Sequence, residues 1–286
     1  PPPPGAACGE GVSVVARSVL RYPGGKWRLA PWIIRHFPHH DAYVEPFGGS
    51  AAVLLQKAPS PLEVWNDLGG EVYNFFLVLR DEGLCARLVR ALELTPWHRL
   101  EYERCLQGLG EPQDDPVERA RRFFVASWQG VWGGSWRYVR SGSRFAITPS
   151  EAWGPFEHLL AASQRLRRVQ FEHRDAFAVM KEYDAPESLF YLDPPYLAST
   201  RAQPGAQYEV DTATEAWHRE LLETVLSLRG MVVLSGYPSP LYEEVLERRG
   251  WVRVEILARG NAMRRKDRVE ALWLSPVVVR ANGRLL

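Results

Sequence analysis

The sequence predicts an α/β fold interrupted by a largely helical insert. Between residues 42 and 67, a strand, a glycine-rich turn, a helix and a second strand follow one another, which is the order of a βαβ nucleotide-binding unit. Short apolar strands alternate with helical patterns again from residue 169 to residue 274. We therefore expect one α/β domain built from residues 12–75 and 165–286, with the helical insert over residues 76–164.

The composition is that of a globular protein and excludes several other classes. Of the 286 residues, 46% are hydrophobic and 24% are charged. The net charge is only +1, so the overall charge does not indicate a nucleic-acid partner. No apolar run approaches the roughly 18 residues that a membrane span needs. Cys8, Cys85 and Cys105 have no metal-ligand spacing, and an odd cysteine count without a signal peptide indicates a reducing cytoplasm. Residues 1–11 are rich in Pro, Gly and Ala, which favours disorder.

The elements of the first half follow from apolar spacing and from the residues that end a helix or a strand. Val12–Leu20 is a short run compatible with a strand, and Arg21–Lys26 makes a sharp Pro-Gly-Gly turn. Apolar residues then recur at helical spacing from Trp27 to Phe37, and Pro38 ends that helix. The next expected elements are a strand at 42–44, a small-residue helix at 51–55, a strand at 62–65, and helical stretches at 72–90 and 116–131.

The α/β alternation resumes after the insert. The expected elements are strands at 169–173 and 189–192, a helix at 214–229, a strand at 231–234, a helix at 240–249, and strands at 252–257 and 270–274. Because helices separate most of these strands, they fit one sheet covered by helices.

Small and acidic residues at strand ends indicate a nucleoside-type ligand. Glu45–Ser50 has small residues where a backbone must approach a ligand closely. Asp67 ends the next strand and could take both hydroxyls of a ribose, or cap the segment after it. Lys26 could pair with a carboxylate on that ligand, or be a solvated cation at a helix start. Asp175 could accept a hydrogen bond from an exocyclic amine or cap a helix.

The most informative stretch is Phe-Tyr-Leu-Asp-Pro-Pro-Tyr at residues 190–196. The apolar run predicts a buried strand, which must end at Asp193 because Pro194 and Pro195 cannot continue a ladder. A carboxylate, a stiff carbonyl at Pro194 and the ring of Tyr196 then project from one strand end, where ligands bind in open α/β sheets. This group could accept hydrogen bonds from an amine and stack on a flat ring. A purely structural Asp that caps a Pro-Pro turn would give the same sequence pattern.

Positive charge and aromatic rings gather in the second half of the insert. Residues 119–168 hold nine arginines against two acids, and four of the eleven tryptophans. Such a mixture suits phosphate contacts and base-edge readout, whereas a solvated helix face over a Trp-filled core would account for most of these side chains. We expect the loop at 133–144 to contact DNA. A second basic cluster, between Arg259 and Arg268, is either a hairpin at a sheet edge or a second phosphate contact.

Four separated motifs, in this order, resemble the Dam-like (D12 class) DNA adenine-N6 methyltransferases. They are RYPGGK (21–26), VEPFGGSAAV (44–53), Asn66-Asp67 and YLDPPY (191–196). The resemblance runs from about Val19 to the C-terminus. It implies a seven-stranded, Rossmann-like methyltransferase sheet with a DNA-recognition insert. It also implies S-adenosylmethionine as methyl donor, no metal, and transfer to the N6 amine of adenine in double-stranded DNA by base flipping. A cognate restriction endonuclease is a candidate partner.

The resemblance also assigns roles to residues. The donor-binding candidates are Tyr22, Lys26, Glu45, Phe47, Gly48, Gly49, Ser50, Asp67, Asp175 and Ala176. The catalytic candidates, which would hold the target adenine, are Asp193, Pro194, Pro195 and Tyr196. The loop GSWRYVRSGSRF (134–145) resembles the DNA-reading loop of the family, and its DNA-binding candidates are Trp136, Arg137, Tyr138, Arg140 and Arg144.

The expected chemistry is orientation of an amine. If Asp193 and the Pro194 carbonyl accept the two N–H bonds, the amine nitrogen can pyramidalise and aim its lone pair at the donor methyl. Tyr196 would stack on the flipped base.

The chain departs from the family at two places. Ala176 stands where the family often has an aromatic residue, and the loop lacks the Asn-Gly-Leu-Cys run of enzymes that read GATC. Three alternatives stay open: a cytosine-N4 methyltransferase, a protein or RNA methyltransferase, which would favour Asn in place of Asp193, and a non-catalytic DNA-binding module.

Overall fold

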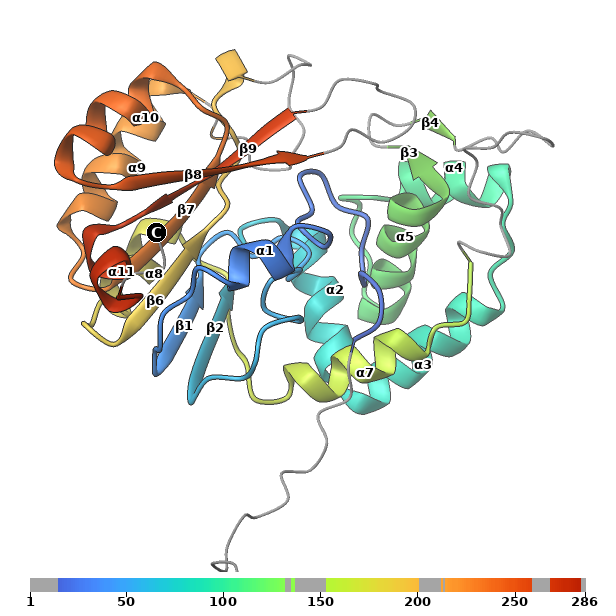
Figure 1. Ribbon diagram of the computed structural model, residues 1–286. Helices are drawn as coiled ribbons and strands as arrows, with labels where there is room; N and C mark the ends of the chain where they lie inside the picture. Colours follow the sequence, from blue (N-terminus) through green and yellow to red (C-terminus); the bar gives the residue numbers. More distant parts are fainter. Residues whose placement is uncertain are drawn as a thin grey trace, which may run out of the picture.

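A seven-stranded sheet forms the centre of the computed structural model (Figure 1), which describes residues 15–131, 135–136, 153–200, 212, 214–258 and 268–283. The strands of the sheet are β1 (Ala42–Glu45), β2 (Leu62–Asn66), β5 (Gln170–Glu172), β6 (Ser188–Leu192), β7 (Met231–Gly236), β8 (Val252–Ala258) and β9 (Arg268–Leu274). A separate hairpin pairs β3 (Gly130–Val131) with β4 (Ser135–Trp136). The helices are α1 (Ala30–Ile34), α2 (Gly70–Arg80), α3 (Glu82–Glu93), α4 (Arg99–Gln107), α5 (Pro116–Gln129), α7 (Glu157–Leu166), α8 (Ala176–Glu182), α9 (Glu215–Ser227), α10 (Pro240–Val245) and α11 (Pro276–Ala281), with short 3₁₀ turns at Ala198–Thr200 and Glu247–Arg249.

The order of the strands reverses between β1 and β6. Their order is β5-β2-β1-β6-β7-β9-β8, and all neighbours are parallel except those of β9, which runs antiparallel to both β7 and β8. The chain moves outward from β1 to β2 and β5, and then returns to place β6 on the other side of β1. Such a reversal is a topological switch point, where α/β folds bind their ligands at the carboxyl ends of the strands.

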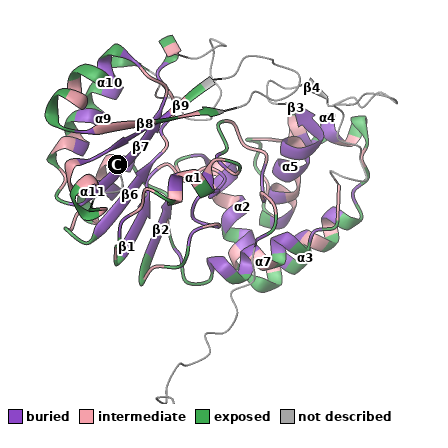
Figure 2. Cartoon of the chain, viewed as in Figure 1, coloured by how far each residue is buried: buried purple, intermediate pink, exposed green. Residues whose placement is uncertain are grey.

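Both faces of the sheet are covered. Every residue of β1, β6 and β7 is buried, as expected for parallel strands that helices cover on two sides. Alternate strand residues enter two separate cores. One core joins Tyr43 and Trp65 to α1, α2 and α11, and the other joins Val44 and Phe190 to α8, α9 and α10. Figure 2 shows the buried strands between helices whose outer sides are exposed.

The helices between β2 and β5 lie beside the sheet (Figure 1) and share its first core. Side chains of α2, α3, α5 and α7 are buried in the same cluster as Tyr43 and Trp65. The expected boundary between residues 75 and 76 falls inside α2. The division into a methyltransferase domain and a target-recognition insert stays a prediction.

Two of the expected helices differ in length or continuity. Helical structure was expected from Trp27 to Phe37, but α1 spans only Ala30–Ile34, because Pro31 fits only the first turn of a helix. The stretch at 72–90 is two helices, since Asp81 has an extended backbone and its side chain accepts the Leu84 N–H at 2.8 Å, which caps α3.

Two expected elements are wrong. The described part of the Val12–Leu20 run, from residue 15 onward, is irregular rather than a strand. Residues 51–55 form turns instead of a helix, because Ala51 has a positive φ of 52°, which a right-handed helix does not allow. The Leu54 N–H is donated to the Glu45 carboxyl at 2.9 Å.

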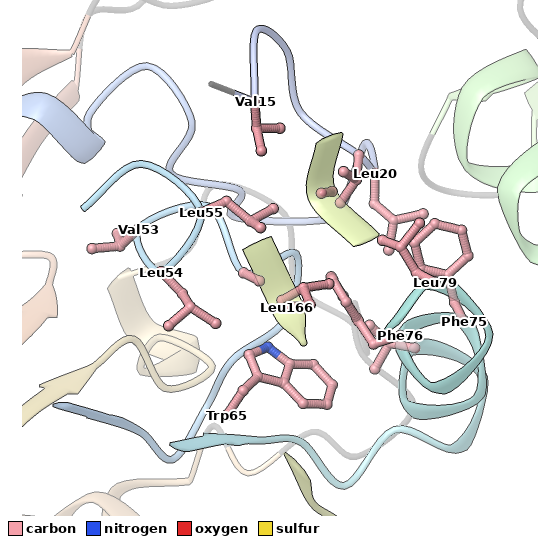
Figure 3. Packing of buried hydrophobic residues seen from close by; sticks show 14 of the residues in the cluster. Val15, Leu20, Val53, Leu54, Leu55, Trp65, Phe75, Phe76, Leu79 and Leu166 are labelled. Atoms are coloured by element: carbon pink, nitrogen blue, oxygen red, sulfur yellow. The ribbon is translucent and has the colours of Figure 1, made fainter. Parts of the chain in front are cut away.

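These turns are held by packing as well as by two backbone hydrogen bonds, from the Leu55 N–H to the Ala51 carbonyl at 3.0 Å and from the Lys57 N–H to the Val53 carbonyl at 2.9 Å. Figure 3 shows Val53, Leu54 and Leu55 gathered near the indole of Trp65, which is fully buried. Polar contacts support the same segment, since Arg165 of α7 donates to the Leu54 carbonyl at 3.0 Å and to Glu63. The segment that follows the first glycine-rich motif is therefore fixed from β2 and from α7.

Candidate active site

A cavity opens at the switch point, at the carboxyl ends of β1, β2, β5 and β6. Its empty space is about 960 Å³ with the open mouth included. All ten donor-binding candidates line it, namely Tyr22, Lys26, Glu45, Phe47, Gly48, Gly49, Ser50, Asp67, Asp175 and Ala176. Asp193 and Pro195 line it as well. The structure thus brings together motifs that lie up to 173 residues apart in the chain.

The first wall of the cavity is a turn whose backbone needs glycine. A Cβ on Gly48 would lie 2.1 Å from the buried Trp65 Nε1, and Gly49 has a positive φ of 46°. Asp67 fastens this turn, because its Oδ2 accepts the Gly49 N–H at 2.8 Å and its Oδ1 accepts the Gly69 N–H at 2.8 Å. Asp67 therefore orients the backbone on both sides of the cavity and presents a fixed carboxylate to it.

Glu45, at the end of β1, is buried and holds the segment behind that turn. Its Oε1 accepts hydrogen bonds from the Tyr43 hydroxyl at 2.6 Å and from the Leu54 N–H at 2.9 Å. Burial raises the pKa of Glu45 to about 8, even though both hydrogen bonds favour its charged form. Near neutral pH this carboxyl can therefore gain or lose its proton when the charge beside it changes.

Asp175 fills one of the two roles that the sequence left open, the cap of a helix. Its side chain accepts the Ala178 N–H at 3.0 Å and so caps α8. The same residue and Ala176 line the cavity beyond the end of β5. The capping role is therefore observed, and the ligand-binding role stays a prediction.

Lys26 contacts the predicted catalytic strand end. Its Nζ lies 2.9 Å from Asp193 Oδ1 and donates to the Gly24 carbonyl at 2.8 Å. The ammonium also lies 4.8 Å from the ring centroid of Tyr196, a cation–π distance. The side chains of Lys26 and Asp193 are only 5% and 18% exposed. Sequence reasoning assigned Lys26 to the donor carboxylate, and the structure adds a pairing with Asp193 that the sequence did not predict.

Tyr196 is fixed through its hydroxyl. That group lies 2.9 Å from Glu270 Oε2 of β9 and 3.2 Å from Ser235 Oγ of β7. Burial, followed by the nearby charges of Asp193 and Glu270, raises the pKa of Tyr196 well above its usual value, so the hydroxyl stays protonated and donates to Glu270. The ring packs edge-on against Tyr237 at 4.6 Å.

His218 supports the same loop and was missed by sequence reasoning. It is fully buried on α9, with its Nε2 3.1 Å from the Pro195 carbonyl and its Nδ1 2.9 Å from the Tyr242 hydroxyl. Since a carbonyl only accepts, Nε2 must carry the hydrogen in this pair. A single His in a helical pattern gives no sequence signal for this role, because both partners come from other elements.

The DNA-binding candidates are largely outside the described residues. Arg137, Tyr138, Arg140 and Arg144 lie there, as do Arg259 and residues 264–266 of the second basic cluster, and Trp136 is placed only as part of β4. Several described arginines between residues 119 and 168 form ion pairs within the fold. These pairs are Arg119–Glu71, Arg121–Glu101, Arg122–Glu118, Arg165–Glu63 and Arg167–Glu82. These five side chains therefore make contacts within the fold, and whether any of them also contacts DNA stays a prediction.

The described residues contain neither a candidate membrane-spanning helix nor a candidate metal site. No helix among them is long and apolar enough to cross a membrane. In the same part of the chain, no group of three or more His, Cys, Asp or Glu side chains could hold a metal ion.

Comparisons with known proteins show which proteins this chain is similar to. Residues 22–104 match the family model for the D12 class N6 adenine-specific DNA methyltransferases. The chain is 25% identical over 282 residues to the DNA adenine methylase of Salmonella typhimurium, covering 93% of this chain and 98% of that protein. It is 25% identical over 280 residues to the DNA adenine methylase of Escherichia coli K12, covering 92% and 97%. The DNA adenine methylase of Serratia marcescens is 27% identical over 188 residues, covering 63% and 67%.

These matches confirm the resemblance that the four motifs predicted. Residues 22–104 are similar to the D12 class, and over more than nine tenths of its length the chain is similar to two proteins named DNA adenine methylase. These descriptions indicate an enzyme with DNA as substrate. A methyltransferase of this kind uses S-adenosylmethionine in general. The seven-stranded sheet agrees with the predicted methyltransferase fold, and the matches do not favour the cytosine-N4 alternative.

Proposed function

We propose that this protein transfers a methyl group from S-adenosylmethionine to the N6 amine of a flipped adenine in double-stranded DNA. The observation that carries the proposal is the position of Asp193. It follows β6 at the switch point, lines the cavity that contains the donor-binding candidates, and pairs with Lys26 at 2.9 Å. An amine acceptor and a nucleoside-binding cavity therefore meet at one strand end.

Several groups around the cavity fit the chemistry of S-adenosylmethionine. Gly48 and Gly49 let the backbone pass closely, and Asp67 offers a carboxylate for ribose hydroxyls. Lys26 offers a cation and Glu45 a carboxyl to the amino-acid end of the donor. When bound, S-adenosylmethionine supplies a methyl group on a positively charged sulfur. That charge beside Glu45 would favour the ionised form of its carboxyl.

Asp193 and Pro194 orient the nucleophile. The Asp193 carboxylate and the Pro194 carbonyl accept the two N–H bonds of the adenine amine, and the adjacent proline rings keep that carbonyl stiff. The nitrogen lone pair is thereby directed at the methyl group. The N–C bond would form as the C–S bond breaks, S-adenosylhomocysteine would leave, and the extra proton would pass from the nitrogen to solvent. Lys26 holds the Asp193 carboxylate in place, so Asp193 acts mainly by preorganisation.

Tyr196 provides the platform for the base. An adenine amine inside a duplex is out of reach, so the base must be flipped out and held by stacking. The Tyr196 hydroxyl is anchored by Glu270 and Ser235, which fixes the plane of the ring. Contacts from Trp136, Arg137, Tyr138, Arg140 and Arg144 would position the duplex, consistent with a helical recognition insert over residues 76–164. A cytoplasmic location and a cognate restriction endonuclease complete the proposal.

The test separates donor binding from transfer. Asp193→Ala should abolish methylation of duplex DNA while the affinity for S-adenosylmethionine, measured by calorimetry, stays within about threefold, because Asp193 orients the acceptor rather than the donor. The control is Asp114→Ala, which removes an exposed carboxylate on the connection before α5 and should leave both quantities unchanged. Methylation retained by purified Asp193→Ala would refute the assignment.

A further inference from the structure

An aromatic side chain that no donor-binding motif contains lines the cavity. Trp217 lies in the first turn of α9, and it faces the same space as Ala176 and Asp67. Two rings hold it at right angles: Phe47 at 5.8 Å and 74°, and Phe177 at 5.5 Å and 66°. Edge-to-face contacts of this kind fix the plane of a ring. Trp217 is therefore oriented by its neighbours and is only partly buried.

Core packing alone does not account for this position. Trp217 borders the second core, whose buried members include Leu221 and Leu222 of the same helix. Those two side chains are fully buried and do not line the cavity, whereas Trp217 does. A ring that only completed the core would turn its surface inward.

The cavity lining also contains a small side chain near the end of β5. The residue after Asp175 is Ala176, a small buried side chain that lines the cavity at the N-terminus of α8. The next residue, Phe177, contacts Trp217 rather than taking the place of a ring at position 176. Near the end of β5, the cavity lining thus contains a small side chain, Ala176, and a large aromatic one, Trp217.

We propose that Trp217 is the stacking surface for the purine of the methyl donor, in the place that an aromatic residue after Asp175 would otherwise fill. The inference rests on the proposed function. Asp67 marks the ribose position at the end of β2, and Lys26 and Glu45 mark the amino-acid end near β1. Since β5 is the neighbour of β2 on the side away from β1, the purine would lie toward β5, where Asp175 and Ala176 line the cavity together with Trp217.

The ligand class follows from this chemistry. A purine nucleoside with a 5′ substituent would place its flat ring on Trp217, with its amine near Asp175. The amino-acid end would add affinity without touching Trp217. Loss of the indole should therefore weaken every ligand that carries the purine by the same factor, whether or not the amino-acid end is present.

The experiment measures binding of two probes by calorimetry. S-adenosylhomocysteine carries the whole donor skeleton, and 5′-methylthioadenosine carries only the purine and ribose end. Trp217→Met removes the ring but keeps apolar volume, and it should weaken both probes by a similar factor of roughly 5 to 100. Trp217→Phe should keep the affinities within about fivefold. Trp97→Leu, which removes a partly buried Trp that contacts Trp153 in the insert, should change neither.

A second variant tests the replacement directly. Adding Ala176→Phe to Trp217→Met should restore part of the lost affinity, because a ring at position 176 could then stack on the purine. In the wild-type chain labelled with 5-fluorotryptophan, the resonance assigned to Trp217 should shift when 5′-methylthioadenosine is added, and that of Trp97 should not. This last measurement does not depend on any non-aromatic variant being folded.

The outcomes distinguish the inference from the proposed function. If wild-type protein binds neither probe, the proposed function itself fails. If it binds both, but the Trp217 resonance stays fixed or folded Trp217→Met binds with wild-type affinity, the proposed function stands and the role of Trp217 is overturned.

Discussion

The donor half and the base half of the cavity fix their functional groups by different means. In the donor half, the backbone forms the site. Gly48 and Gly49 make up the wall, and the Asp67 carboxylate accepts hydrogen bonds from main-chain amides. In the base half, side chains hold the Asp-Pro-Pro-Tyr loop, since His218 binds the Pro195 carbonyl and Glu270 binds the Tyr196 hydroxyl.

This difference predicts where each half is sensitive. A wall made of backbone tolerates few added atoms, so substitutions there should act on folding and donor affinity together. A loop held by side chains can lose one support and stay folded, so substitutions there should lower the rate of transfer at nearly constant donor affinity. Four substitutions, ordered from the largest expected effect to the smallest, can break or sharpen this contrast.

The largest effect is expected for Gly48→Ala. The added Cβ would lie 2.1 Å from Trp65 Nε1, and Trp65 is fully buried, so neither group can move away cheaply. We expect a loss of about 3 kcal/mol or more in the free energy of unfolding, measured by urea denaturation. Gly83→Ala, in the first turn of α3 with only ordinary contact to Asp81, is the matched control and should be neutral or slightly stabilising. Equal stability of the two variants would contradict a rigid donor wall.

The second prediction concerns the pH dependence given by Glu45. Burial raises its pKa to about 8 in the folded protein, against about 4.3 in an unfolded chain. The folded state therefore binds more protons between these values, so this contribution to stability is fully present below about pH 4 and is lost as pH rises through 8. The slope should reach about 1.4 kcal/mol per pH unit inside that window.

Glu45→Gln isolates this contribution. The glutamine carbonyl can still accept from Tyr43 and Leu54, but it does not titrate. Subtracting its urea-denaturation curve of stability against pH from that of the wild type should leave a difference that falls with rising pH between about 4 and 8. A flat difference would show that Glu45 ionises normally. Glu93→Gln, at the exposed end of α3, should give no such difference.

The third prediction tests the support behind Pro195. His218→Leu leaves the Pro195 carbonyl and the Tyr242 hydroxyl without their partner, so we expect kcat to fall about 10- to 100-fold through misplacement of the loop. Donor affinity should stay within about threefold. His218→Gln keeps a donor that can reach the Pro195 carbonyl, and it should recover most of the rate, whereas a purely space-filling role would favour Leu. Single-turnover methylation and calorimetry on the same preparations decide between these readings.

The smallest effect is expected for Tyr196→Phe. The ring remains for stacking, but the hydrogen bonds to Glu270 and Ser235 are lost, so the rate should fall about 3- to 10-fold, corresponding to about 1 kcal/mol. The matched control is Tyr183→Phe, which removes a similar Tyr–Glu hydrogen bond, to Glu172 at 2.8 Å, among residues that do not line the cavity. If both variants lose the same activity, the loop is not held through its phenol.

The elements that the sequence predicts well are those with strong apolar runs and clear stops. The strand before Asp193 was expected at 189–192 and is found at Ser188–Leu192, because two prolines leave little choice about where it ends. The expected helix at 51–55 failed for the opposite reason. Small apolar residues favour a helix locally, but the backbone at Ala51 turns left-handed, which no local pattern records.

The site could be predicted only where a motif carries its own chemistry. The glycine turn and Asp67 were expected to adjoin the ligand, and both line the cavity. The pairing of Lys26 with Asp193 joins residues 167 positions apart. His218 and Trp217 were missed because α9 has an ordinary amphipathic pattern, and their contacts to Pro195 and Phe47 depend on how that helix packs over the switch point.

The most direct test of the central claim is the identity of the methylated nucleoside. Duplex DNA is incubated with the protein and S-adenosylmethionine that carries an isotopically labelled methyl group, and the DNA is then digested to nucleosides for mass spectrometry. The account predicts the label on N6-methyldeoxyadenosine with wild-type protein and none with Asp193→Ala. Label on N4-methyldeoxycytidine, or label of equal amount with the variant, would contradict it.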